Sequence, residues 1–160
     1  MTLKRGRRVA GIDPGQTGAV VVYEDGEVIA ILDMPMVQTK GKLKYVNGKV
    51  LREFLVGHEV DEIIVEQVAS RPGQGVRSVF NFGMGFGAVL AVAMTVPVPL
   101  TLVAPQVWKR RAGLLKTGKD EARCKVLTMF PKSRASFQRK KDIGRADALL
   151  IATYGVPAVV

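Results

Sequence analysis

Cysteine and histidine are nearly absent from this sequence: its 160 residues include one of each, Cys124 and His58. A single cysteine excludes an intramolecular disulfide, and Cys124 falls in an amphipathic segment, which favours a core thiol over a nucleophile. There is no histidine–cysteine cluster of the kind that holds zinc. A metal site in this chain would therefore be built from oxygen ligands.

Proline interrupts the apolar stretch of the sequence that could otherwise be considered for a membrane span. Its apolar stretch Ala88–Val103 contains Pro97 and Pro99 and falls short of the roughly 20 residues that a span needs. The basic start, MTLKRGRR, is too short and too polar for a signal peptide. We therefore expect an intracellular, cytoplasmic protein with no membrane partner; a phage protein acting in its host's cytoplasm would fit equally.

Acidic residues are scarce relative to basic ones, with 14 Asp and Glu against 24 Lys and Arg and a net charge of +10. Thirteen of the basic residues lie between Lys109 and Arg145, where only Asp120, Glu121 and Asp142 oppose them. Such a surface favours a polyanion, because each neutralised phosphate releases counterions. A solvated, solubilising face is the alternative, but the clustering favours DNA.

A hydrophobic content of 48% and the absence of repeats and linkers suit one folded domain over residues 1–160. Apolar runs of strand length bounded by turn signals predict strands at Arg8–Ile12, Ala19–Tyr23, Val28–Leu32, Glu62–Glu66 and Leu100–Val103. Longer segments predict helices at Lys49–His58, Val76–Met94, from Pro105, at Lys119–Phe130 and at Arg145–Tyr154, with a basic loop at Thr39–Asn47. Three strands in hairpins followed by alternating helices and strands predict an α/β fold, a mixed five-stranded sheet with helices on both faces.

Three acids stand where such a fold would bring them together. Asp13 ends the first strand, Glu66 ends the fourth, and Asp147 lies early in the last helix within an apolar stretch. Each has an ordinary alternative as a turn residue, an ion-pair partner or a helix cap. Buried carboxylates are costly unless paired or metal-bound, so together they indicate a shared cation, and oxygen ligands favour Mg²⁺ or Mn²⁺.

The motifs around these acids resemble a known family. GIDPGQTGAVV at 11–21, VEQV at 65–68 and ADALLIA at 146–152 resemble the RuvC family of Holliday-junction resolvases, of the ribonuclease-H-like superfamily. VAPQVWKRRAGL at 103–114 and GKDEAR at 118–123 resemble its phage-type branch. The first motif alone is weak, but three in order over nearly the whole chain are specific. The resemblance implies a ribonuclease-H-like form of the expected sheet.

The resemblance also implies a homodimer that makes paired, symmetric nicks in four-way DNA junctions during recombination and repair, without a nucleotide cofactor. Asp13, Glu66 and Asp147 would be catalytic metal ligands for two Mg²⁺ ions roughly 3.5–4 Å apart, with Mn²⁺ able to substitute. Asp13 would bridge the ions, with Glu66 on one side and Asp147 on the other. One ion would activate water and the other would stabilise the leaving 3′ oxygen, giving a 5′ phosphate and a 3′ hydroxyl.

The fourth acid of the family pattern is displaced here. Bacterial members place an acid or histidine three residues before the last aspartate, and this chain has Gly144 there. Asp142 lies five residues before Asp147; such a pair does not share a helix face, but Asp142 is expected to precede the helix, where a bent loop could aim it at the metals. Plant organellar resolvases similarly use an acid five residues upstream, so we predict Asp142 as the fourth ligand. The alternative is a solvated acid answering Lys140 and Lys141.

The basic residues near these acids are the candidates for DNA contacts. In the family, a lysine near the start of the helix expected over 119–130 helps hold the scissile phosphate, which indicates Lys119, with Lys109 as a second candidate. Arg71 and Arg77 follow Glu66 and are placed to reach the junction centre. The predicted DNA-binding residues are Arg71, Arg77, Lys109, Arg110, Lys116, Lys119, Lys140 and Lys141.

Two further features of the segment after Glu66 concern the dimer and the junction. Gly83-x-x-x-Gly87 allows a close backbone approach, either to the sheet or to a second helix across a dimer axis; the residues leave both open, and the resemblance favours the dimer. Many bacterial relatives carry an aromatic wedge shortly after the catalytic glutamate, where this chain has no aromatic residue. Arg71, or Phe80 and Phe82, would then open the junction.

Three other functions fit parts of the sequence. GIDPGQTG also resembles the phosphate-binding hairpin of actin-like ATPases, but that fold needs two such domains and an adenosine-binding segment. A DNA-binding module that does not cut is opposed by the intact acids Asp13, Glu66 and Asp147, although the displaced fourth acid keeps it open. A nuclease with a broader range of branched substrates, such as forks and flaps, is not distinguished from a strict junction resolvase by any residue.

Overall fold

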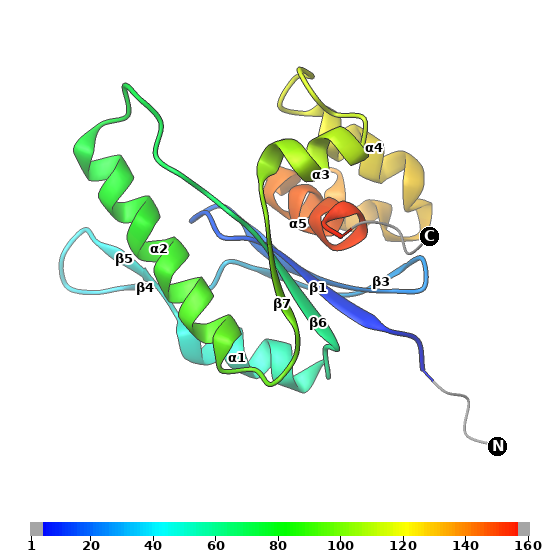
Figure 1. Ribbon diagram of the computed structural model, residues 1–160, viewed down its shortest axis with the longest axis horizontal. Helices are drawn as coiled ribbons and strands as arrows, with labels where there is room; N and C mark the ends of the chain where they lie inside the picture. The colour runs from blue at the N-terminus through cyan, green and yellow to red at the C-terminus, as the bar shows by residue number, and fades with distance from the viewer. Residues whose placement is uncertain (1–4, 157–160) are drawn as a thin grey trace.

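The computed structural model describes residues 5–156, and its centre is a five-stranded sheet (Figure 1). β1 (Arg8–Asp13), β2 (Ala19–Glu24) and β3 (Glu27–Asp33) form an antiparallel meander, and β6 (Glu62–Glu66) and β7 (Leu100–Val103) continue from β1 in parallel. The strand order is β3-β2-β1-β6-β7. The predicted mixed sheet is therefore confirmed.

Helices cover both faces of this sheet (Figure 1). α1 (Gly48–Gly57) and α2 (Val76–Met94) pack on one face, and α3 (Pro105–Arg111), α4 (Glu121–Met129) and α5 (Ile143–Tyr154) on the other. Two 3₁₀ helices, η1 (Pro131–Phe137) and η2 (Lys140–Asp142), connect α4 to α5. Alternate strand residues enter the two cores: Val20 and Val22 face α1 and α2, whereas Ala19 and Val21 face α5.

The backbone of helix α5 packs closely against the backbone of β1 because β1 has a glycine at the contact. A Cβ at Gly11 would overlap the carbonyl oxygen of Ala148 on α5, so only glycine fits there. The α5 residues Ala146, Leu149, Leu150 and Ile151 are fully buried in the same core. This packing fixes the height of α5 above the end of β1, where the predicted site lies.

Two sequence-based boundaries need correction. The segment expected to be a loop at Thr39–Asn47 contains part of a two-stranded antiparallel ribbon, β4 (Met36–Gln38) and β5 (Lys44–Val46), separate from the main sheet. The helix expected over Lys119–Phe130 is shorter and runs from Glu121 to Met129. It ends there because Pro131 has no N–H to continue the helical hydrogen bonding.

The outer face of α2 is unusually apolar for a surface helix. Val76 is 88% exposed, Phe80 64% and Met94 66%. By length and composition alone, α2 also suits a membrane span. A Cβ at Gly83 or Gly87 would meet nothing within 4 Å, so these glycines face open space and the alternative that packs them on the sheet is wrong.

Candidate active site

The site begins where β1 and β6 end side by side. The two strands are parallel with Ile12 beside Val65, so the next residues, Asp13 and Glu66, emerge from the same edge of the sheet. The turn after β1 orients the first carboxylate, because the N–H of Gly15 donates to Asp13 Oδ1 at 3.1 Å. The Asp-Pro-Gly sequence thus supplies both the acid and the turn that aims it.

Asp147 joins these two acids from the helix above. No described residue forms a hydrogen bond or ion pair with its side chain, although it is partly buried. Burial, followed by the charges of Asp13 and Glu66, raises the pKa of Asp147 to about 7. The predicted trio is therefore brought together closely enough for the three charges to interact.

The pKa values of the other two carboxyl groups, Asp13 and Glu66, are also raised. Burial raises the pKa of Asp13, against the opposing effects of the Gly15 N–H and Lys109. Burial also raises the pKa of Glu66, as does the charge of Asp13, against a hydrogen bond from Trp108 and the charges of Lys109 and Arg71. An acid cluster that is costly to ionise is typical of functional sites rather than of structural ion pairs.

Such a donor set fits a divalent cation. Three carboxylates offer the hard oxygen ligands that Mg²⁺ and Mn²⁺ prefer. A cation would offset the burial that raises all three pKa values and the carboxylate charges that add to it at Glu66 and Asp147. Within residues 5–156, however, no three His, Cys, Asp or Glu side chains already surround one point closely enough to hold a metal ion.

Trp108 is a site residue that the sequence pattern did not reveal. Its indole Nε1–H donates to Glu66 Oε2 at 2.7 Å, and the side chain is fully buried beneath the site. A buried indole N–H requires an acceptor, and here the acceptor is a candidate catalytic carboxylate. The only signal was position: α3 follows β7, which lies next to the strand that carries Glu66.

Two of the predicted lysines lie beside Asp147. A pocket of about 290 Å³ is lined by Lys109, Lys119 and Asp147, with Leu114, Thr117, Gly118, Ala122 and Ile143 completing its wall. Lys109 also acts electrostatically on all three carboxyls of the trio. These ammonium groups provide positive charge at the place where a phosphate would approach the acids.

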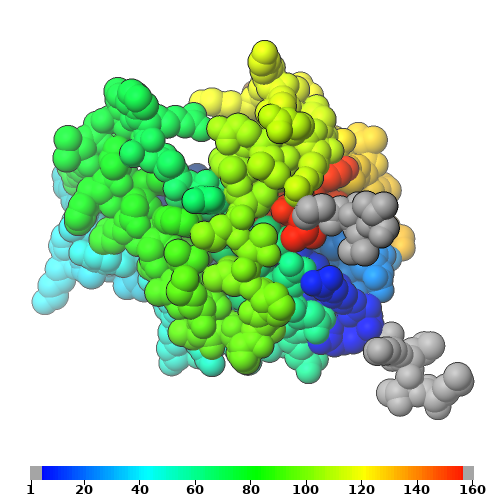
Figure 2. Space-filling view, in the orientation of Figure 1, coloured from blue at the N-terminus to red at the C-terminus, as the bar shows by residue number. Residues whose placement is uncertain are grey.

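A groove opens on the other side of Glu66. It has a volume of about 440 Å³ and lies between the loop that follows β6 and the start of α3, where Figure 2 shows the surface hollowed between the green and yellow-green segments. Arg71 and Phe82 line this groove with Glu66. Arg77 and Phe80 are exposed on α2 and do not line it. Phe82, rather than Phe80, is therefore the aromatic side chain beside the acids.

The remaining predicted DNA contacts lie on the α3 and α4 side of the molecule. Arg110, Lys116, Lys140 and Lys141 are exposed. None of the four forms an ion pair with another residue in the range 5–156. They stay candidates for phosphate contacts.

Asp142 is not brought into the trio. It ends η2 with a side chain only 2% exposed, and it accepts hydrogen bonds from the Arg139 backbone at 2.9 Å and the Arg139 guanidinium at 2.8 Å. These bonds lower the pKa of Asp142, with a further contribution from Arg145 at 3.9 Å. Both carboxylate oxygens are thus engaged by arginine, and the position does not support the predicted role as a fourth ligand.

The position at which bacterial family members carry that ligand is Gly144 here, and there is no room for a larger side chain. A Cβ at Gly144 would overlap the carbonyl oxygen of Thr17, because the turn between β1 and β2 lies directly against the start of α5. No acid or histidine fits there without moving that turn. The glycine is therefore a consequence of how closely the Asp13 turn and α5 are packed.

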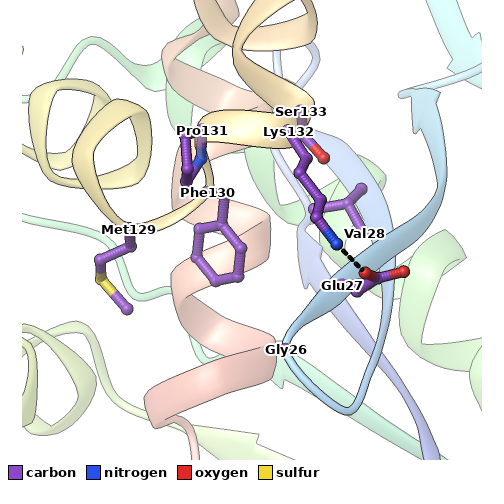
Figure 3. A pocket seen from close by; sticks show the side chains of 8 residues that line it. All are labelled: Gly26, Glu27, Val28, Met129, Phe130, Pro131, Lys132 and Ser133. Carbon is purple, nitrogen blue, oxygen red and sulfur yellow. Dashed lines mark hydrogen bonds and ion pairs between the residues drawn. The ribbon is translucent and has the colours of Figure 1, made fainter.

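Another pocket lies away from these acids and has different chemistry. It is formed by the β2–β3 turn and the start of η1, at the end of β2 opposite Asp13 (Figure 3). Its lysine, Lys132, donates to Glu27 at 2.7 Å. The charges of this pocket neutralise each other, and it does not compete with the trio as the active site.

Comparison with known proteins identifies the family. The model of the RuvC family, crossover junction endodeoxyribonuclease RuvC, matches residues 9–154. The chain belongs to the RuvC family. The match spans all three acids, and it makes the chain a junction-resolving endodeoxyribonuclease by family, as the sequence motifs predicted; the finer placement in a phage-type branch stays a prediction.

Individual relatives agree with this assignment. The chain is 28% identical to a crossover junction endodeoxyribonuclease RuvC from Christiangramia forsetii, over 99% of this chain and 80% of the relative. A Thermus thermophilus RuvC structure matches with a TM-score of 0.59 and 26% identity, over 91% of this chain and 90% of the other.

Two more distant structures share the fold. T. thermophilus RuvC in complex with a Holliday junction substrate gives a TM-score of 0.65 at 22% identity, covering 91% and 90% of the two chains. The yeast mitochondrial Holliday junction resolvase Ydc2 gives 0.52 at 15%, covering 94% and 78%. The predicted ribonuclease-H-like fold is therefore confirmed.

Proposed function

We propose that this protein cuts four-way DNA junctions through Asp13, Glu66 and Asp147, with paired nicks made by the two sites of a homodimer. The observation that carries the proposal is that these three partly buried acids meet at one edge of the sheet. Asp13 and Glu66 follow paired residues of adjacent parallel strands, and their charges act on Asp147. Cationic cavities flank them, with Lys109 and Lys119 on one side and Arg71 on the other. The structure of a relative with its junction substrate supports DNA as the partner.

The trio would hold Mg²⁺, with Mn²⁺ as a substitute, and two ions per site is the arrangement we propose from the family resemblance. The bound metal supplies an activated water and stabilises the charge that develops on the leaving oxygen. Trp108 holds the Glu66 carboxylate in one orientation. Lys109 and Lys119 would bind the scissile phosphate beside Asp147, and Phe82 would support the unstacked base in the groove after Glu66.

The outer face of α2 is our candidate for the dimer interface. Exposed apolar side chains at Val76, Phe80 and Met94 would be buried by a second copy, and the open glycines at 83 and 87 permit a close helix–helix approach. A pair of copies related by a two-fold axis would present two identical sites to a two-fold symmetric junction. Sedimentation equilibrium tests this: a dimer supports the interface, and a monomer at working concentration contradicts it.

The test of the function is incubation of the protein with a synthetic four-way junction, a fork and a linear duplex, with and without Mg²⁺. We expect metal-dependent, paired and symmetric nicks in the junction and an intact duplex, with 5′ phosphate ends that a ligase reseals. Cutting of the fork at a similar rate would show a broader branched-DNA nuclease. Binding without cleavage in every divalent ion would leave a structure-selective binding module and overturn the proposal.

A further inference from the structure

The β4–β5 ribbon is a separate two-stranded element attached next to the active site. The N–H of Met34 donates to the carbonyl of Gly18, at the end of the Asp13 turn, at 3.0 Å, and the N–H of Asn47 closes the base on Pro35 at 2.7 Å. Above this base, Met36 pairs with Val46, and Gln38 with Lys44. The ribbon then projects from the body beyond α2 (Figure 1).

The attachment of the ribbon is firm on its inner side. Gln16 of the Asp13 turn lines a pocket of about 160 Å³ together with Tyr45 and Val46 of the ribbon and Met84 and Gly85 of α2. Val46 packs into the core under α1 and α2.

The outer part of the ribbon is strongly and uniformly basic. Lys40, Lys42 and Lys44 are exposed, and no acidic residue occurs between Asp33 and Glu53. Within residues 5–156, none of the three lysines forms an ion pair. Asp33 is itself bound by Arg145, and Glu53 lies 3.9 Å from Lys49. No acidic residue in the described range 5–156 therefore pairs with the positive charge of the ribbon.

The ribbon also lies on the opposite side of the acids from the other basic segment. Lys109 and Lys119 belong to the side of α3 and α4, whereas the ribbon packs against α2 on the other face of the sheet. DNA that crosses the acids and follows both basic segments would be held on two sides. A two-stranded ribbon is also one of the few protein elements that fits the major groove of duplex DNA.

We propose that the β4–β5 ribbon is a second DNA-binding element, which holds the phosphate backbone of a duplex arm leaving the cleavage site through Lys40, Lys42 and Lys44. The proposal rests on the junction-cutting function and adds the ribbon as the surface that holds this arm. The contact is independent of sequence, because it is made to phosphates.

The test compares K40Q/K42Q/K44Q with the charge-retaining K40R/K42R/K44R by fluorescence anisotropy on a four-way junction without divalent metal. The glutamine protein should lower the slope of log affinity against log salt by about 2–3 between roughly 50 and 200 mM, at ~0.9 for each phosphate that is no longer neutralised. The arginine protein should keep the wild-type slope. Both proteins should cut saturated junction at the wild-type single-turnover rate, because the lysines do not touch the acids.

The outcomes separate this proposal from the proposed function. A wild-type protein that neither binds nor cuts the junction would refute the function itself. A wild-type protein that binds and cuts, while the glutamine protein keeps the same salt slope, would refute the ribbon alone. An unchanged slope together with an altered dimer–monomer equilibrium would show that the ribbon contacts a second copy instead of DNA, and would also overturn the proposal.

Discussion

Asp142 and Asp147 lie five residues apart and have opposite environments. Arg139 and Arg145 surround Asp142, and their hydrogen bonds and charges lower its pKa. Asp147 has no partner among the described residues, and burial beside two other acids raises its pKa to about 7. A carboxylate that is already satisfied stabilises the fold, whereas one that is left unsatisfied marks a place where a ligand is expected.

The same comparison explains how the chain holds its site. Arg145 links Asp142 to Asp33 at the end of β3, with its guanidinium 2.6 Å from Asp33 Oδ1. This network fixes the start of α5 on the meander, and α5 in turn carries Asp147 over β1. These contacts favour Asp142 as the residue that positions α5 over a role for Asp142 as a metal ligand, and the following predictions test this assignment from the largest expected effect to the smallest.

Removal of an unsatisfied acid should abolish the chemistry and preserve the fold. We expect Asp13→Asn and Asp147→Asn each to lower the single-turnover rate of junction cleavage by at least ~10³-fold, since several kcal/mol of charge stabilisation depends on the ligands. Junction binding should stay within a fewfold of wild type. A variant that still cuts at a tenth of the wild-type rate would exclude that acid from the reaction.

A side chain at position 144, where bacterial relatives carry the fourth ligand, should destabilise the fold. Gly144→Ala places a methyl group against the Thr17 carbonyl and should destabilise the protein by about 2–3 kcal/mol, as overpacking does. Gly57→Ala is the matched control, because a Cβ there meets nothing within 4 Å. Urea unfolding measures both. Equal stability of the two variants would show that the turn yields and that a fourth ligand could have occupied position 144.

Asp147 and Asp142 should make the free energy of unfolding change with pH in opposite directions. Because the pKa of Asp147 rises from 3.8 to about 7 on folding, the folded state holds more protons between these values, and stability falls as the pH rises through 7. The pKa of Asp142 is lowered, so its contribution is present at neutral pH and is lost as the pH falls into the acid range. Urea unfolding in EDTA measures the free energy of unfolding of both proteins. Between about pH 5 and 8 this free energy should decline less for Asp147→Asn than for wild type. An equal decline would contradict the assignment.

The smallest expected effect concerns the residue that orients Glu66. Trp108→Phe removes the indole N–H and keeps most of the buried ring, so it should cost about 1 kcal/mol of stability. The single-turnover rate on saturated junction should fall by about tenfold, with junction affinity unchanged, because a misoriented carboxylate affects the chemical step. A loss of stability with an unchanged rate would assign Trp108 to packing only.

The sheet and the trio of acids could be predicted from the sequence because both depend on local signals. Strands showed as apolar runs between turns, and Asp13, Glu66 and Asp147 stood at their ends or within an apolar helix. The short strands β4 and β5 were missed, since lysine and glycine in this segment mask a ribbon whose pairing depends on its base at Pro35 and Asn47. Trp108 could not be assigned, because its partner Glu66 lies far away in the sequence and is brought to it by packing. Asp142 is held by Arg139 and Arg145, each three residues away, whereas the sequence analysis weighed only Lys140 and Lys141 as its partners.

The division of roles between the two acids can be measured most directly by metal-dependent stabilisation. Thermal unfolding of wild type, Asp147→Asn and Asp142→Asn is followed as Mg²⁺ or Mn²⁺ is added, with metal binding measured in parallel by calorimetry. The account predicts that Asp142→Asn begins from a lower melting temperature yet gains as much from metal as wild type, whereas Asp147→Asn gains little. A folded Asp142→Asn protein with the wild-type melting temperature and no response to metal would make Asp142 a ligand and contradict the account.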